Sequence, residues 1–192
     1  MSAILDFLAW VAIYVGRAAL WTLAITGVAA PLLWALGLAR AIPLAAATAF
    51  VVCLALLPLP DPAAFDCALH GKPPLLVPFA GLAEALGRTL GAGDIPGLVT
   101  DLTLVSTVMN VVFFLLPGAA LALLTARPWA GLAFGLALTF GIEATQLTGL
   151  WGLYSCPHRQ PDTTDLVTNT LGVALGFWLM RRWLDRRSTP RR

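Results

Sequence analysis

The stretch LTLVSTVMNVVFFLLPGAALALLTA, residues 102–126, decides the structural class of this protein. It contains no charged side chain and exceeds the roughly 20 apolar residues that a helix needs to cross ~30 Å of hydrocarbon. The rest of the chain is similar, because 59% of its 192 residues are hydrophobic and only 11% are charged. Soluble domains carry about 25% charged residues. We therefore predict an integral membrane protein.

Four further apolar stretches lie at about 18–39, 41–59, 129–150 and 166–183. Together with 102–126 they predict an all-α, polytopic transmembrane helix bundle of about five spans. The apolar segment within residues 1–17 is too short to cross alone, so it lies in the membrane interface or extends the first span past Arg17. The predicted organisation is this segment, two transmembrane helices (18–59), an extracytoplasmic loop (60–101), a three-helix core (102–185) and a basic tail (186–192).

Basic residues are concentrated at the end of the chain, where six of the twelve occupy the last twelve positions. Because this tail directly follows an apolar helix, it indicates orientation rather than nucleic acid binding. The positive-inside rule then places the C-terminus in the cytoplasm and the segments 60–101 and 151–165 outside. Abundant Ala, Leu, Gly and Arg suggest a bacterial source, so we expect a multi-pass protein of the bacterial inner membrane, with membrane lipids and no nucleic acid as partners.

The predicted outer loop contains one stretch with helical spacing, residues 79–90, in which Phe79, Leu82, Leu86 and Leu90 recur on one face. This spacing predicts a short amphipathic helix. It either lies on the outer membrane surface or packs on top of the bundle.

The chain has three cysteines, of which Cys53 falls inside the second predicted span. Cys67 and Cys156 fall in the two predicted outer segments, where the compartment is oxidising and a disulfide is feasible. Two free thiols, or one free thiol and one ligand, are the alternatives. Metal or cofactor binding is not expected, because His70 and His158 are isolated and a metal site needs several ligands at short spacing.

Polar side chains in three predicted spans lie at similar depths, within roughly 10 Å of the outer surface by the helical rise. Three amides and one carboxylate form this set, and one arginine and two carboxylates lie in the loop above it. The residues are Asn110, Glu143, Gln146 and Asn169 in the spans, with Arg159, Asp162 and Asp165 above them. Because ionisable groups are costly in a bilayer, we predict one outer-face site.

Within this predicted site, Glu143 needs a cationic or hydrogen-bonding partner, and Arg159 is the expected one. Asn110 and Gln146 have the alternative of holding helices together through their amides. Arg159 has the alternative of a loop salt bridge with Asp162 or Asp165. Asp165 with Thr164 is also a plausible N-cap of the last helix.

These residues resemble the patterns of the VanZ-like family. Asn110 with Pro117-Gly118, and Glu143 with Gln146, resemble two of its short motifs. The most specific match is the block from Arg159 to Gly176, which resembles the family's Arg–x–x–Asp–x–x–Asp–x–x–x–Asn–Thr–x–Gly–x–x–x–Gly. Pro78-Phe79 resembles the Pro-Phe of its outer loop, although Val77 replaces the Asn that often precedes it.

The resemblance covers about residues 75–185 and implies a cell-envelope protein, in a family with a member associated with resistance to the glycopeptide teicoplanin. We expect the outer site to bind or modify an amphiphilic envelope component: a lipid-linked glycan, a phospholipid or a glycopeptide. Glu143, Asp162 and Asp165 are the acid–base candidates, and Asn110, Gln146, Arg159 and Asn169 the binding candidates. The alternatives are a non-catalytic scaffold acting through partners and, ranked last, a small transporter.

Overall fold

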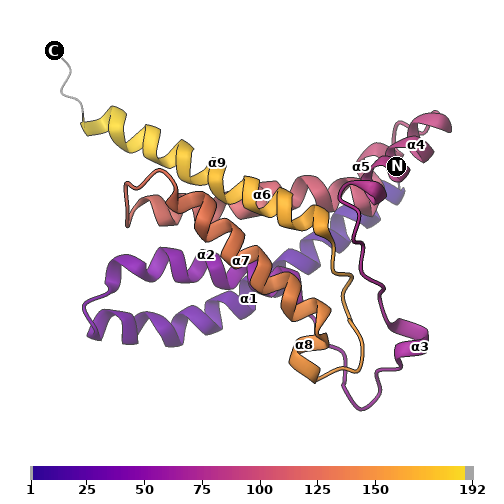
Figure 1. The fold of residues 1–192 in the computed structure, drawn as a ribbon, viewed down its shortest axis with the longest axis horizontal. Helices are drawn as coiled ribbons and strands as arrows, with labels where there is room; N and C mark the ends of the chain where they lie inside the picture. Colours follow the sequence, from indigo (N-terminus) through magenta and orange to yellow (C-terminus); the bar gives the residue numbers. More distant parts are fainter. Residues whose placement is uncertain (1, 189–192) are drawn as a thin grey trace.

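The computed structural model describes residues 2–188 and has the predicted all-α architecture (Figure 1). Within this range there is no β-strand, and Leu75 and Asp162 form an isolated β-bridge. The helical elements are α1 (Ser2–Ala35), η1 (Ala39–Ala41), α2 (Ile42–Leu56), α3 (Cys67–His70), α4 (Ala80–Gly91), α5 (Gly97–Thr100), α6 (Leu102–Ala122), α7 (Ala130–Leu147), α8 (Gly149–Gly152) and α9 (Thr163–Ser188).

Four of the described helices are long and apolar enough to cross a membrane: Phe7–Ala35, Ala39–Leu56, Leu102–Ala122 and Ala130–Leu147. The fifth predicted span corresponds to α9, which has 26 residues and ends in an arginine-rich segment that lowers its hydropathy. It packs along α6 and α7 rather than standing apart. The bundle therefore consists of four apolar helices and a fifth, α9, that has a polar end.

The first helix is longer than the predicted first span. α1 is continuous from Ser2 to Ala35 and has no break at Arg17. Residues 2–17 are therefore the first half of α1, which is the second of the two possibilities that the sequence leaves open. α1 lies against α2 and buries little of its own surface within the chain.

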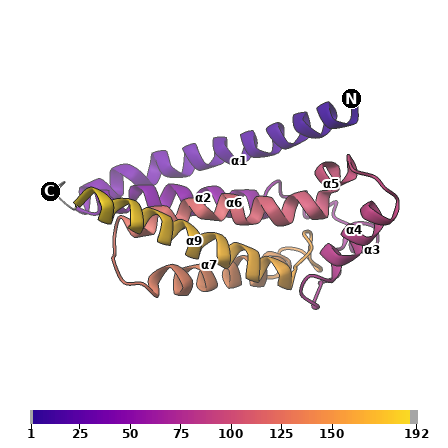
Figure 2. The ribbon, with the colours of Figure 1, turned by 90° about the horizontal axis from the view of Figure 1, so that it is seen from above.

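The two ends of the bundle differ in charge. The α1–α2 turn, the α6–α7 turn and the end of α9 lie together at one end, whereas α3, α4, α5 and α8 lie at the other (Figures 1 and 2). We call the first the basic end, because it carries Arg40, Arg127 and four arginines of α9. The second is the loop end, where both predicted outer segments are found together.

α9 is held against α6 by close backbone contact. A Cβ atom on Gly176 would lie 2.1 Å from the carbonyl oxygen of Leu115, and one on Gly172 would lie 2.5 Å from that of Val111. Gly118 of α6 reciprocates, because its Cβ would lie 2.0 Å from the Val173 oxygen. Small residues at such crossings let two helices approach until their backbones touch.

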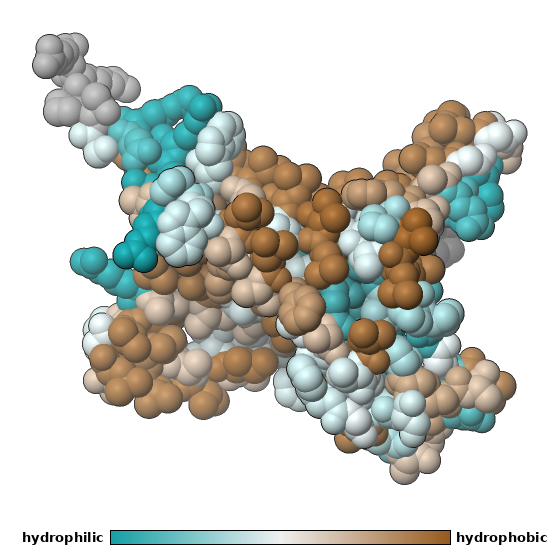
Figure 3. All heavy atoms as spheres, viewed as in Figure 1, coloured by the Kyte–Doolittle hydropathy of each residue, from teal (hydrophilic) through white to brown (hydrophobic). Residues whose placement is uncertain are grey.

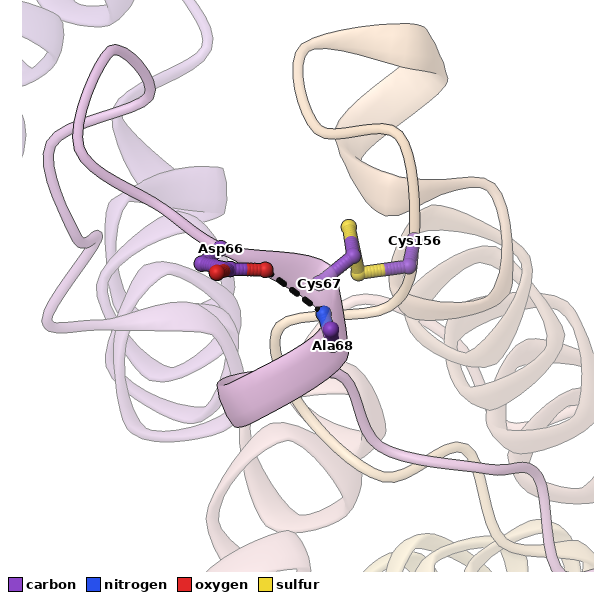
Figure 4. Close-up of a disulfide and its surroundings, with 4 residues drawn as sticks. All are labelled: Asp66, Cys67, Ala68 and Cys156. Carbon is purple, nitrogen blue, oxygen red and sulfur yellow. Dashed lines mark hydrogen bonds between the residues drawn. A yellow bond between two sulfur atoms is a disulfide. The ribbon is translucent and has the colours of Figure 1, made fainter.

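A disulfide joins the two long segments of the loop end (Figure 4). Cys67, at the start of α3, bonds to Cys156 with 5.9 Å between their Cα atoms. Asp66 caps α3 by accepting a hydrogen bond from the Ala68 amide at 2.8 Å. The pairing that the sequence makes feasible is thus present, and it joins two cysteines that are 89 residues apart in the sequence.

Beyond the disulfide, the two segments are joined by main-chain hydrogen bonds. Lys72 N donates to Pro157 O at 2.9 Å and Leu75 N to Pro161 O at 2.8 Å. Thr163 N then donates to Leu75 O at 3.0 Å. Residues 72–75 therefore fix the path of residues 157–163 as that chain approaches the first turn of α9.

The predicted amphipathic helix is present as α4. Ala85 and Thr89 are buried on its inner side, towards α6, whereas Leu86 and Leu90 are exposed. Glu84 and Arg88 form an ion pair at 2.9 Å on the helix surface. The space-filling view accordingly shows apolar surface around this part of the loop end (Figure 3). α4 therefore both packs on the bundle and presents apolar side chains outward.

The glycine contacts generate a stability prediction. Gly176→Ala forces α6 and α9 apart, so we expect the free energy of unfolding to fall by about 1–3 kcal/mol, as for overpacked cores. The matched control is Gly141→Ala on α7, where an added Cβ meets nothing within 4 Å. Thermal unfolding in detergent should show a lower Tm for Gly176→Ala only. Equal Tm values for the two variants would contradict this packing.

Candidate functional site

The end of α2 creates a hydrogen-bonding problem in an apolar setting. Its last helical bond runs from Leu57 N to the oxygen of Cys53 at 2.9 Å. The residues that follow include Pro58 and Pro60, which have no N–H group. The carbonyl groups of residues 54–57 therefore lack intrahelical partners, and an unsatisfied carbonyl is costly where water is absent.

Polar side chains from α1, α7 and the 153–162 segment solve this problem. Each reaches one carbonyl oxygen at or just after the end of α2, and we call the group the α2 cap. The Tyr14 hydroxyl donates to Leu54 O, and the Arg159 guanidinium donates to Leu57 O. Gln146 Nε2 donates to Ala55 O at 3.0 Å, and the Tyr154 hydroxyl donates to Pro60 O at 2.7 Å. His158 Nε2 is hydrogen-bonded to Leu56 O at 3.3 Å. Four consecutive carbonyls thus obtain partners from three separate parts of the chain.

The expected pairing of Arg159 with Glu143 is wrong. Arg159 donates to the oxygen of Leu57, and its guanidinium lies over the Tyr14 ring, 5.3 Å from the ring centroid. None of the ion pairs among the described residues includes Arg159, which also excludes the alternative loop salt bridge. A cation at a helix C-terminus is favoured by the helix dipole, so the end of α2 provides its counter-charge.

Glu143 instead receives a main-chain donor. Its Oε2 atom accepts a hydrogen bond from the Asp162 amide at 2.9 Å. Asn110 of α6 donates through Nδ2 to Oδ1 of Asp165 at 2.7 Å. These two bonds bring α6, α7 and the start of α9 to one place. We call Glu143, Asp162, Asp165 and Asn110 the carboxylate cluster.

The cap of α9 also differs from expectation. Asp162, not Asp165, caps the helix, because Asp162 Oδ1 accepts from the Thr164 amide at 2.7 Å. The Thr164 hydroxyl is directed elsewhere and accepts from Phe79 N at 3.0 Å. Asp165 is therefore free of the capping role and turns to Asn110. Phe79, which precedes α4, is thereby tied to the first turn of α9.

The carboxylate cluster is rich in acceptors. Glu143 lies within electrostatic range of both Asp162 and Asp165, so three carboxylates share one region. Glu143 is 8% exposed, and its Oε1 atom has no hydrogen-bond partner among the described residues. No basic side chain forms an ion pair with any of the three within residues 2–188. The cluster can therefore accept hydrogen bonds or a positive charge.

Further buried oxygen atoms near the cluster along α7 and α9 lack partners in the described structure. On α9, Asn169 is 3% exposed and follows Asp165 by one turn. On α7, Thr139 precedes Glu143 by one turn and is fully buried. The unpartnered atoms on these two helices are Thr139 Oγ1, Glu143 Oε1, Gln146 Oε1, Asn169 Oδ1 and Thr170 Oγ1.

The predicted single site thus consists of two adjoining groups. Gln146 and Arg159 serve the α2 cap, whereas Asn110, Glu143 and Asp165 belong to the carboxylate cluster. The groups adjoin because Gln146 follows Glu143 by one turn of α7. The sequence patterns did not predict a role for Tyr14, Tyr154, Thr139 or Thr170. The Pro58-Leu-Pro60 sequence was the available signal for the cap, and the one-turn spacing from Glu143 was the signal for Thr139.

Comparison with known proteins supports the resemblance seen in the sequence. The family model described as VanZ/LLP1 matches residues 44–184. The match includes nearly all of α2, the loop end, α6, α7 and most of α9, but not α1. No curated protein and no solved structure matches the chain. Of the α2 cap, only Tyr14 lies outside the matched range.

The α2 cap generates a prediction on pH. Burial lowers the pKa of His158 from its usual value of 6.5, with a further lowering by Arg159 and an opposing effect of the Leu56 hydrogen bond. Below pH 6.5 the unfolded chain therefore binds more protons than the folded protein, so stability falls as the pH is lowered. We expect the Tm in detergent to decrease between pH 7 and pH 5.

The variant His158→Gln keeps a donor for the Leu56 oxygen but does not titrate, so its Tm should depend less on pH. The matched control is His70→Gln, which alters the exposed second histidine of the chain. The assignment fails if His158→Gln and the wild type lose stability in parallel, or if His70→Gln flattens the profile instead.

Proposed function

This chain belongs to the VanZ/LLP1 family, whose model matches residues 44–184, and from that premise we propose that its carboxylate cluster binds the polar part of an amphiphilic cell-envelope component. The observation that carries the proposal is the grouping of three carboxylates with one side-chain donor, Asn110. A complementary ligand supplies donors: sugar hydroxyls, amide N–H groups or an ammonium group.

This chemistry favours a lipid-linked glycan or a lipid-tailed glycopeptide over an anionic phospholipid head group. The expected anion-binding residue, Arg159, is engaged by Leu57 and Tyr14. We therefore give Arg159 a positioning role, because it holds the segment that carries Asp162. The binding roles go to Glu143 and Asp165, with Asn110 and Asn169 orienting the ligand.

The depth of the cluster supports an amphiphilic ligand. Asn110 is eight residues into α6, or about 12 Å along the helix, and Glu143 is four residues from the end of α7, or about 6 Å. A ligand whose polar part reaches these residues from the loop end keeps its apolar tail beside the bundle. That is the position of a lipid-anchored molecule in one leaflet.

We propose that this leaflet is the outer one. The positive-inside rule assigns the basic end to the cytoplasm of a bacterial cell, which leaves the loop end outside the inner membrane. The disulfide between Cys67 and Cys156 supports the same orientation, because such bonds persist in oxidising compartments. The proposed ligand would then come from the external leaflet or from the medium.

Binding is the activity proposed, and covalent modification would be an extension of it. Of the three cysteines, two are bonded to each other and Cys53 is buried among α1 and α2, so no thiol reaches the cluster. If a reaction occurs, Glu143, Asp162 and Asp165 are the groups available for proton transfer. The unpartnered Oε1 atom makes Glu143 the first choice among them.

A structural scaffold is the second candidate function, and one observation favours it. Gln146 and Arg159, two residues of the family pattern, satisfy carbonyl groups of α2. A chain in which every patterned residue serves folding would act through partner proteins instead. Binding and folding must therefore be measured on the same variants.

The test is Glu143→Gln, which can still accept from the Asp162 amide but replaces one carboxyl oxygen by an amide NH2 group, a donor in place of an acceptor. A charge-assisted hydrogen bond contributes about 1.5–3 kcal/mol, so affinity should fall about ten- to hundredfold. The probe is teicoplanin, titrated against purified full-length protein in detergent. Amphiphiles that copurify from bacterial membranes should also be lost from this variant when they are identified by mass spectrometry.

The matched control is Glu84→Gln, which makes the same change on exposed α4 at the same end. It should bind as the wild type does. An unchanged affinity of Glu143→Gln, at an unchanged Tm, would overturn the proposed site. A collapse in Tm for both Glu143→Gln and Asp165→Asn would favour the scaffold.

A further inference from the structure

An apolar recess lies between α6 and α9, on the side of the bundle towards the basic end. It is an open hollow of about 330 Å³, and its lining includes the two small residues Ala119 and Gly176. The recess is lined by Leu115, Leu116 and Ala119 of α6 and by Leu179, Met180 and Trp183 of α9. None of these residues belongs to the α2 cap or to the carboxylate cluster.

The recess ends beside positive charge. Trp183 lines it, and the guanidinium of Arg187, one turn further along α9, lies 3.8 Å from the centroid of the Trp183 ring. Arg181 is paired with Asp185 at 2.9 Å, but Arg187 has no carboxylate within salt-bridge distance among the described residues. A groove about 10 Å long, from Gly176 to Trp183, therefore leads to a cation that has no carboxylate partner within residues 2–188.

We propose that this recess holds one acyl chain of an anionic phospholipid, whose phosphate pairs with Arg187. The apolar lining matches a hydrocarbon chain. Basic residues at the ends of transmembrane helices attract anionic head groups. Arg187 has a long aliphatic stem, so its charged group can remain in the head-group region while the stem follows the helix.

Charge complementarity selects this occupant over the other candidates. A helix from a second copy of the chain, seated in the same recess in parallel, would bring another arginine-rich end against Arg182, Arg186 and Arg187. A zwitterionic phospholipid offers the same acyl chain but no net charge to the guanidinium. The recess is separate from the carboxylate cluster, so the lipid proposal does not depend on the proposed outer ligand.

The test is a titration of full-length protein in detergent, followed by native mass spectrometry, with palmitoyl-oleoyl phosphatidylglycerol and the corresponding phosphatidylcholine as probes. The wild type should bind phosphatidylglycerol more tightly. One surface arginine contributes about a fivefold change in affinity for anionic lipid. Arg187→Gln should therefore weaken phosphatidylglycerol binding about fivefold and phosphatidylcholine binding by less, because the choline ammonium offsets the charge of the phosphate.

The matched control is Arg182→Gln, which removes the same charge from the same helix. Arg182 also stacks on a tryptophan, lying 4.0 Å from the Trp178 ring centroid, but Trp178 does not line the recess. This variant should lose less affinity for phosphatidylglycerol than Arg187→Gln, because its guanidinium stacks on a tryptophan outside the recess. Equal losses in the two variants would show general attraction to the basic end and overturn the proposal.

Two further measurements distinguish binding of a lipid in the recess from binding of a phosphate group to Arg187 alone. Ala119→Phe fills the recess and should weaken both lipids, whereas Ala137→Phe, at an exposed position of α7, should not. Inorganic phosphate, added at the lipid concentration, should leave phosphatidylglycerol binding intact. Displacement by phosphate, or equal wild-type affinity for the two lipids, overturns the proposal even if Ala119→Phe fails to fold.

Discussion

The carbonyl groups at the end of α2 impose the constraint on which the loop end depends. Because α2 ends at Leu56 and two prolines follow, consecutive carbonyl oxygens at its end have no partner within the helix. In the hydrocarbon region no water is present to donate hydrogen bonds to them. Side chains from α1, α7 and the 153–162 segment fill this need. Their bonds fix where the segment runs, and therefore where Asp162 and the start of α9 lie. The disulfide and the main-chain bonds to residues 72–75 hold the same segment from its other side.

This arrangement explains how a helix bundle with an apolar interior tolerates three carboxylates. Asp162 is placed where its amide meets Glu143 and its side chain caps α9, so one residue serves two helices. Asp165 is then turned towards Asn110. Close contact between α6 and α9 at Gly172 and Gly176 sets the spacing on which that bond depends. The carboxylate cluster and the glycine contacts between α6 and α9 therefore depend on each other. A substitution in either group should alter the geometry of the other.

The family match leaves out α1, yet α1 supplies Tyr14 to the α2 cap and to Arg159. The matched region therefore contains the acceptors of the cap and most of its donors, whereas this chain adds one aromatic partner from outside it.

The two ends of the bundle have different proposed roles. The loop end collects acceptors for a donor-rich ligand, and the basic end collects cations beside an apolar recess. Each end is suited to a different class of amphiphile.

The sequence by itself determined the membrane class, the approximate positions of the long helices after residue 40, the amphipathic helix at about residues 79–90 and the identity of the polar residues worth examining, because hydropathy and helical periodicity are local properties. The feasible pairing of Cys67 with Cys156 also followed, since it needed only the side of the membrane. Only the tertiary structure decided which partner each polar group found. Arg159 was expected at Glu143, but it donates to a carbonyl group at the end of α2, about a hundred residues away in the chain. Such competition between acceptors is settled by distance in space, which the spacing of residues along a sequence does not contain.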